Sequence, residues 1–210
     1  MEERATERMR ADVVIFSDYV CPFCYVAEAA IARLRADGVV VQRRAFELRP
    51  PSSPLPDLDA GHYRAAFERA VLPLAQRAGV EIRFPALATR TRKAHEAAAH
   101  ARDAGKLEAM HDAIFRAYFV EGRDIGRIDV LVAIGESVGL DRTGLKVALD
   151  IDKHAERVAA DNALAAAFGI TAVPAFVRER DSGHEIQLGA REYRALRRWL
   201  RDGTEGRRTV

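Results

Sequence analysis

Apolar residues near the start of the chain occupy consecutive positions and then recur at helical spacing. The run over 12–17 is β-rich and continuously apolar, which predicts a buried strand. Over 23–36 the apolar positions fall at helical spacing, and Gly38 lies just past them as a stop signal. A second strand is predicted over 39–46. The chain is therefore expected to open with a strand, a helix and a second strand.

The middle of the chain almost lacks the pattern of a strand. A stretch rich in Pro, Ser and Asp over 48–59 predicts a loop and a boundary. The helices predicted after it cover roughly 62–78, 90–104, 106–118, 127–138 and 142–149. Pro73 should kink or split the first of them, because proline lacks a backbone N–H and clashes with the preceding turn. We therefore expect an all-helical insertion from about residue 60 to 150.

Strand patterns return near the end of the chain. The elements predicted there are a helix over 152–168, strands over 175–177 and 185–188 joined by a turn at Asp181-Ser182-Gly183, and an amphipathic helix over 191–201. The arginines of the last helix, at 191, 194, 197 and 198, are interpreted as its solvated side. Residues 1–10 and 202–210 are polar and are expected to be flexible termini. Together these elements predict an α/β fold.

The composition is that of an ordinary globular protein. Hydrophobic residues make up 49% of the 210 residues and charged residues 30%. The 33 basic and 31 acidic residues nearly cancel to a formal charge of +2, so neither nucleic acid nor a membrane surface is expected as a partner. The charged N-terminus contains no apolar stretch typical of a signal peptide. We expect a cytoplasmic protein that is a monomer or a homodimer.

The two cysteines of the sequence form the motif Cys21-Pro22-Phe23-Cys24 at the predicted strand-to-helix junction. A sulfur in the first turn of a helix lies near unpaired backbone N–H groups and the positive end of the helix dipole, which predicts a lowered pKa for Cys21. Pro22 suits the first helical position, where its missing N–H has no intrahelical partner. Cys24 lies one turn deeper and should be less exposed. Two thiols are too few for a structural zinc site, so no metal is expected.

The segment 169–174 is a small-residue loop that ends in Pro174, directly before a predicted strand. Such a tight connection suits a cis peptide bond before the proline. In a fold that brings this loop against the cysteine pair, the backbone of Val173 would pair with an extended substrate chain. Val173 and Pro174 are therefore candidate substrate-binding residues.

Two segments resemble the hallmark motifs of the DsbA family of thioredoxin-fold oxidoreductases, and more narrowly its FrnE-type cytosolic branch. They are 16–25, which contains the cysteines, and 168–176, which contains Pro174. Three further stretches are similar to that branch: 45–50, 91–95 and 115–119. The resemblance implies a thioredoxin-like domain formed by 11–60 and 151–201, with a helical insertion domain at 61–150.

The resemblance also implies thiol–disulfide exchange, in which Cys21 attacks and Cys24 resolves. The dipeptide between the cysteines is Pro-Phe, whereas many FrnE-like members carry Pro-Trp and the periplasmic oxidants carry Pro-His. A weaker oxidant than the periplasmic enzymes is therefore expected. Arg90 stands where this branch is expected to have an asparagine.

Several other residues have more than one interpretation. Asp18 and Tyr19, like Pro22 and Phe23, belong to the predicted active-site loop, where they would tune the thiol pKa, shuttle a proton or only shape the loop. His95 and His100 lie on a predicted helix of the insertion; surface or interface positions are favoured over the active site. Core packing is the favoured interpretation of three aromatic residues: Phe115, Tyr118 and Phe119.

The leading hypothesis is a disulfide oxidoreductase or isomerase that exchanges disulfides with protein or peptide substrates. No cofactor is expected, with glutathione as a candidate redox partner, because the sequence has neither a Gly-rich dinucleotide motif nor a P-loop. One alternative is a glutathione-dependent small-molecule isomerase or transferase of the kappa or 2-hydroxychromene-2-carboxylate isomerase type. Those proteins normally act with a single serine or cysteine, so the second cysteine favours exchange. The other alternative is a chaperone-like binding module.

Overall fold

The computed structural model describes residues 11–180 and 183–202. The predictions made for 1–10, for 203–210 and for Asp181 and Ser182 of the predicted turn lie outside the described residues. The elements in chain order are β1 (Val13–Ser17), α2 (Pro22–Ala36), β2 (Val41–Ala45), α3 (Gly61–Ala70), α4 (Leu72–Ala78), α5 (Arg92–Asp103), α6 (Leu107–Phe119), α7 (Ile128–Ser137), α8 (Arg142–Asp150), α9 (Ala155–Ala167), β3 (Ala175–Arg180), β4 (Gly183–Leu188) and α10 (Tyr193–Arg201).

The strands of the described residues form one mixed sheet in the order β2-β1-β3-β4. β1 and β2 are parallel and are connected through α2, while β3 is antiparallel to both β1 and β4. The predicted strand–helix–strand opening is therefore confirmed. The second strand is shorter than predicted: the N–H of Val39 bonds to the carbonyl of Leu34 at the end of α2, so pairing with β1 begins only at Val41.

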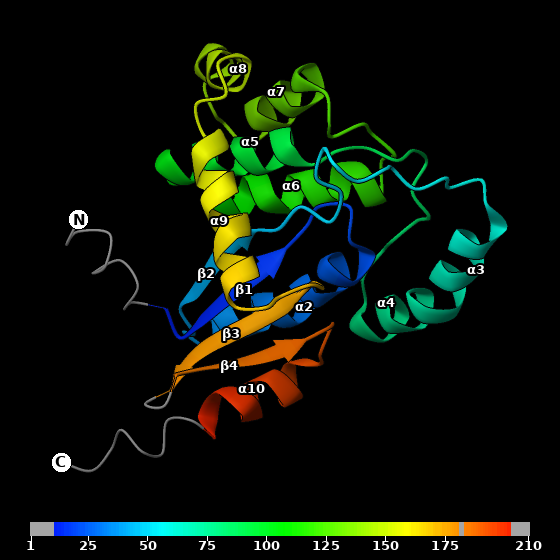
Figure 1. Ribbon diagram of the computed structural model, residues 1–210, viewed down its shortest axis with the longest axis vertical. Coiled ribbons are helices and arrows are strands. Elements are labelled where there is room, and N and C mark those ends of the chain that lie inside the picture. The colour runs from blue at the N-terminus through cyan, green and yellow to red at the C-terminus, as the bar shows by residue number, and fades with distance from the viewer. Residues whose placement is uncertain (1–10, 181–182, 203–210) are drawn as a thin grey trace.

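Alternate residues of the central strands pack against different helices, because successive side chains of a strand point to opposite faces. Val13 and Ile15 of β1 and Phe176 of β3 join a core with α2 and α10. Phe16 and Val177 join a larger core on the opposite face, which contains residues of α5, α6 and α7. Figure 1 shows this layering, with α5–α8 above the sheet and α10 below it.

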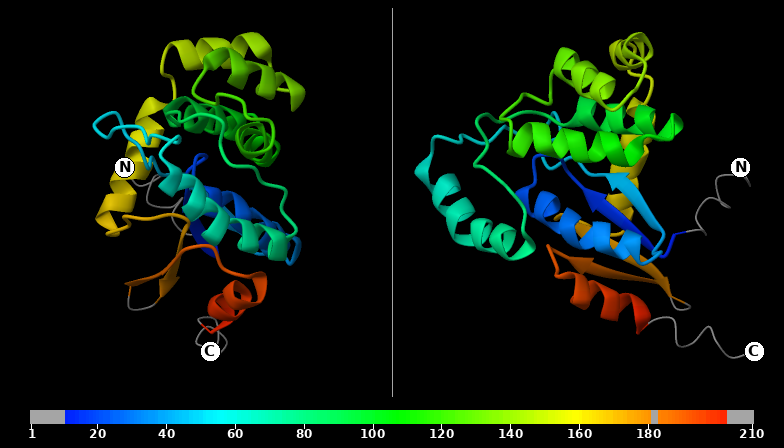
Figure 2. Two further views of the ribbon diagram at one scale, coloured as in Figure 1. Left: turned by 90° about the vertical axis from the view of Figure 1, so that its right-hand side faces the viewer. Right: turned by 180° about the vertical axis from the view of Figure 1, so that it is seen from behind.

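The helices between β2 and β3 follow the predicted pattern closely. Pro73 divides the predicted helix over 62–78 into α3 and α4, as expected. The two short helices lie beside α2 (Figure 2), and Phe67, Val71 and Ala75 pack against Val26 of α2. α9 begins later than predicted because Asp152 adopts a left-handed conformation, with φ of 55°, which ends the preceding turn.

The helical part of the protein is tied to the loop after β2. Arg90 donates to the backbone carbonyls of Arg49, Pro50 and Ser53, so the residue that departs from the expected asparagine holds the proline-rich loop in place. Within the described part of the chain, no helix combines the length and the apolar character needed to span a membrane.

Candidate active site

Cys21 is the N-cap residue of α2, four residues beyond the end of β1. Its carbonyl accepts hydrogen bonds from the N–H groups of Cys24 and Tyr25, and Pro22 occupies the first turn, as predicted. That turn contains no acidic residue, so no carboxylate of the helix itself competes for the positive end of the helix dipole. A sulfur anion at this position would therefore be stabilised by the helix N-terminus.

Both cysteines are free thiols with buried side chains. Cys21 is 4% exposed and Cys24 is 1% exposed, which is the predicted order, although the difference is small. Burial raises the pKa of the Cys24 thiol well above its usual range, and the hydrogen bond to Cys21 and the charge of that neighbouring sulfur raise it further. Cys24 is therefore a poor nucleophile until a base removes its proton.

The loop that ends in Pro174 lies directly against the first cysteine. β3 starts beside the end of β1, with Ala175 opposite Phe16. The residues that follow β1 and those that precede β3 therefore meet at the same end of these two central strands. The Cys21 thiol donates to the carbonyl of Val173 over 3.4 Å, and the Val173–Pro174 peptide bond is cis. The sequence-predicted residues Cys21, Val173 and Pro174 are thus brought together.

Asp18 belongs to the loop before Cys21, whose N–H donates to the Asp18 carbonyl, and its side chain is fully buried. Its Oδ2 accepts a hydrogen bond from the backbone N–H of Leu48 at 2.7 Å, which fixes the carboxylate in one orientation. Its charge is one of the causes that raise the pKa of Cys24. The carboxylate is therefore close enough for its charge to act on the Cys24 thiol.

His95 pairs with this carboxylate, with its Nε2 3.3 Å from Asp18 Oδ1. The favoured interpretation of His95 as a surface or interface residue was wrong: the side chain is 5% exposed and its ring contacts that of Tyr19 at a centroid distance of 4.9 Å. His100 lies elsewhere on α5, beside His154, and does not join this group.

Tyr19 connects the cysteine loop to α6. Its hydroxyl lies 2.9 Å from Nδ1 of His111, and its ring packs against Phe115. Burial raises the pKa of Tyr19, so the phenol stays protonated. Phe115, Tyr118 and Phe119 are buried, which confirms that they are core residues.

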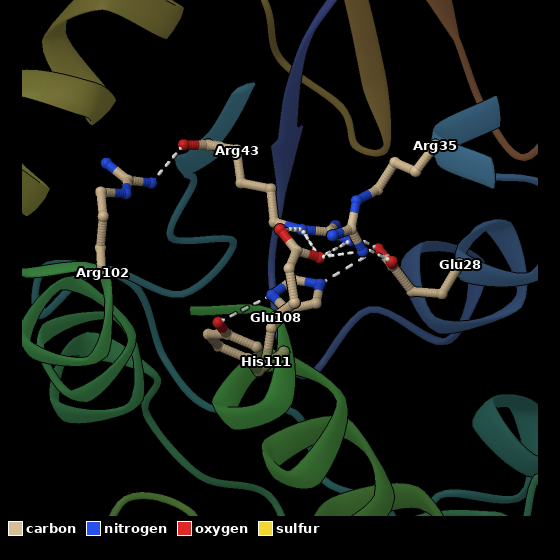
Figure 3. A network of polar contacts seen from close by, with 7 residues as sticks. Glu28, Arg35, Arg43, Arg102, Glu108 and His111 are labelled. Atoms are coloured by element: carbon tan, nitrogen blue, oxygen red, sulfur yellow. Dashed lines mark hydrogen bonds and ion pairs between the residues drawn. The ribbon is translucent and has the colours of Figure 1, made fainter. Parts of the chain in front are cut away.

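His111 also belongs to a partly buried polar network, which Figure 3 shows. Its Nε2 lies 3.1 Å from Glu28 Oε1, and Arg43 donates to both oxygens of Glu28 at 2.9 and 2.8 Å. Arg43 also donates to Glu108, which pairs with Arg35 at the rim of the network.

The charges of this network favour its ionised form. Burial opposes the charged form of Glu28, but His111 and Arg43 outweigh burial and lower the pKa of Glu28 to about 2. Arg43, 5% exposed, is balanced by two carboxylates. The network therefore holds α2, β2 and α6 together behind Tyr19.

Sequence reasoning missed Glu28, Arg43 and His111. The available signal for His111 was its position four residues before Phe115, on the same face of a predicted helix. Pro22 and Phe23 are partly exposed beside Cys21, as expected for residues that would meet a substrate. Among the residues described, no group of three or more His, Cys, Asp or Glu side chains is placed to hold a metal ion.

Comparison with known proteins relates this geometry to a family. The DSBA-like thioredoxin domain family matches residues 12–201. The uncharacterized protein YwbO of Bacillus subtilis is 36% identical over 181 residues, which cover 80% of this chain and 87% of that protein.

Two solved structures share the fold over nearly the whole chain. A probable DsbA oxidoreductase of Streptomyces coelicolor superposes with a TM-score of 0.80 at 29% identity, over 94% of this chain and 91% of that one. A 2-hydroxychromene-2-carboxylate isomerase superposes with a TM-score of 0.73 at 21% identity, over 93% of this chain and 94% of that one. At that identity the isomerase supports the fold alone.

Proposed function

The chain belongs to the DSBA-like thioredoxin domain family, and from this membership we propose that it exchanges disulfides with protein or peptide substrates through Cys21 and Cys24. The observation that carries the proposal is the place of Cys21 at the N-terminus of α2, with its thiol against the carbonyl of Val173. A dithiol at a helix N-terminus, next to a backbone segment that can pair with an extended chain, suits attack on a disulfide in such a chain.

The first step is attack by the Cys21 thiolate on one sulfur of the substrate disulfide. A bond forms between Cys21 and that sulfur, and the other substrate sulfur leaves as a thiolate and takes up a proton. The helix N-terminus stabilises the attacking anion. Because Cys21 donates to Val173, an incoming chain would replace this contact with its own pairing to the backbone of Val173.

The second step is attack by Cys24 on the Cys21 sulfur of the mixed disulfide. Since burial raises the pKa of Cys24, its proton must leave as the new bond forms. Asp18 accepts that proton, and His95 supports the carboxylate from its other side. The Cys21–Cys24 disulfide forms and the second substrate sulfur leaves. The protein pair is thereby oxidised by two electrons and the substrate is reduced; the reverse sequence oxidises a substrate dithiol.

Exchange accounts for the site better than the small-molecule alternative. A one-thiol isomerase or transferase has no use for a second cysteine with its own buried carboxylate, whereas the resolving step needs both. The chaperone-like alternative likewise leaves Asp18 and His95 unexplained. The cytoplasmic location and the monomeric or homodimeric state stay predictions.

Trapping the mixed disulfide tests the proposed function. The Cys24→Ser variant, mixed with a peptide that contains a disulfide, should accumulate a covalent adduct on Cys21 that mass spectrometry detects and dithiothreitol removes. The Cys21→Ser variant, which keeps Cys24, serves as the matched control and should form little adduct. Equal adduct on both variants, or none on either, would count against the assigned roles.

A further inference from the structure

We propose that a basic groove beside the active-site helix binds an acidic segment of the polypeptide substrate. This inference rests on the proposed exchange function, since it names the kind of chain that would reach Cys21. The groove is defined by its four arginines, Arg33, Arg77, Arg191 and Arg194, and by the apolar floor between them.

The groove is a cavity of about 470 Å³ between α2, α4 and the start of α10. Its floor contains small and aliphatic side chains, among them Val26, Ala30 and Ala190. The volume is within the range of roughly 300–1,000 Å³ that is typical of ligand sites. Small floor residues leave space for a backbone to lie close to α2, which suits an extended peptide segment.

The charge of the groove is strongly one-sided. Four arginines line it, against one acidic residue, Glu192, although the whole chain carries a formal charge of only +2. The arginines come from three parts of the chain: α2, α4 and the segment that opens α10. The fold therefore concentrates positive charge that the overall composition does not predict.

These guanidinium groups have no acidic partners within the described part of the protein. Arg33 lies over the ring of Tyr193 at 4.3 Å, and Arg77, Arg191 and Arg194 are exposed. Among the residues described, none of the four forms an ion pair. By contrast, the nearby Arg35 and Arg197 are paired with Glu108 and Asp37.

Unpaired arginine side chains present planar forks that match the geometry of carboxylates. Because four guanidinium groups line one groove with an apolar floor, the complementary ligand is a chain that carries both acidic and apolar side chains.

The position of the groove links it to the cysteines. Ala27, on its floor, lies three residues beyond Cys24 on α2, which is slightly less than one helical turn. Ala190 follows Gly189, whose N–H donates to the carbonyl of Pro174 over 2.8 Å. One end of the groove is thus fixed to the loop that contacts Cys21. A substrate that lies along Val173 and Pro174 would continue over α2 between these arginines.

The test measures binding separately from chemistry. The probes are a fluorescent acidic peptide without cysteine and a neutral peptide of the same length. The double variant Arg191→Glu/Arg194→Glu reverses two charges of the groove, and Arg77→Glu reverses a third from a different helix. Arg198→Glu is the matched control, because Arg198 is an exposed arginine of α10 that does not line the groove.

The expected result is that the acidic peptide binds the wild type and Arg198→Glu more tightly than the neutral peptide does. The double variant should weaken this binding by about tenfold, as two lost surface ion pairs of typical strength would. Arg77→Glu should weaken it in the same direction, and added salt should reduce the wild-type preference.

Unchanged affinity in the double variant and in Arg77→Glu would overturn the proposal, and so would an equal loss in Arg198→Glu. Displacement of the acidic peptide by glutathione disulfide at similar concentration would assign the groove to a small glutathione-type ligand instead, which also contradicts the proposal. Exchange with a neutral disulfide peptide is measured alongside. If the wild type fails in that assay, the exchange function fails while the binding result still decides the groove.

Discussion

Replacing Asp18 with asparagine should slow the resolving step and leave the first attack unchanged. The asparagine side chain has nearly the same size, and its amide oxygen can still accept from the N–H of Leu48, so the buried loop should keep its shape. The substitution removes the group that we propose receives the proton of Cys24. Loss of a positioned general base typically costs about 10²–10⁴-fold in rate.

An opposing effect reduces this cost. The charge of Asp18 is a minor cause of the raised pKa of Cys24, after burial and the neighbouring Cys21, so its removal eases ionisation of the thiol. This lower pKa increases the ionised fraction of the Cys24 thiol and recovers part of the rate. The loss of the base exceeds this gain, so the resolving step should still slow by at least about tenfold.

The assay is a single turnover with a peptide disulfide that carries a fluorophore and a quencher. Rapid mixing separates formation of the mixed disulfide from release of the second thiol. Asp12→Asn is the matched control, because Asp12 also accepts from a backbone N–H, that of Val40 at 2.8 Å, but lies at the exposed start of β1. A second phase in Asp18→Asn with the wild-type rate and pH dependence would refute the role assigned to Asp18.

The remaining predictions concern stability and thiol reactivity. The pKa of Glu28 is about 2 in the folded protein against 4.5 ordinarily, so its contribution is present above pH 4.5 and is lost as pH falls towards 2. Urea unfolding of the wild type should show a loss of about 3 kcal/mol over this window, and an equal loss in Glu28→Gln would contradict the pairing. Leu34→Ala should lower the free energy of unfolding by about 2–5 kcal/mol, because Leu34 is fully buried between α2 and the sheet; a change below about 1 kcal/mol would be inconsistent with that packing. In Cys21→Ser, iodoacetamide should modify Cys24 more slowly in the folded protein than in the urea-unfolded one, since burial is the main cause of its raised pKa; equal rates would refute this.

The elements around the cysteines could be predicted because their signals are local. The apolar run of β1, the spacing of apolar residues in α2 and the break at Pro73 each depend on neighbours within one or two turns. Local structure also placed Cys21 at a helix N-terminus. The family resemblance then predicted that the loop before Pro174 lies against it, and the contact with Val173 is consistent with that.

The environment of the cysteines could not be predicted in the same way. His95 belongs to an alanine-rich helix that is buried on most sides by its neighbours, so no apolar stripe indicates which way the imidazole faces. It meets Asp18 across 77 residues of sequence. Glu28, Arg43 and Glu108 come from three elements, and only the tertiary arrangement shows that their charges compensate one another.

The arginines in and just before α10 also show what the sequence alone could not predict. Their prediction as a solvated face was correct for Arg191, Arg194 and Arg198, which are exposed, whereas Arg197 is half-buried and pairs with Asp37. Spacing along one helix could not reveal that two of them share a groove with Arg77, more than a hundred residues earlier in the chain. Helical periodicity predicts exposure, whereas a binding surface depends on which elements the fold brings together.

Equilibrium redox titration of the Cys21/Cys24 pair against glutathione is the most direct test of the exchange function. The wild type should interconvert reversibly between a dithiol and an intramolecular disulfide in one two-electron transition. Cys21→Ser and Cys24→Ser should both lack that transition. If the wild type forms no reversible disulfide between these two residues over the accessible range of glutathione potentials, the proposed function is wrong.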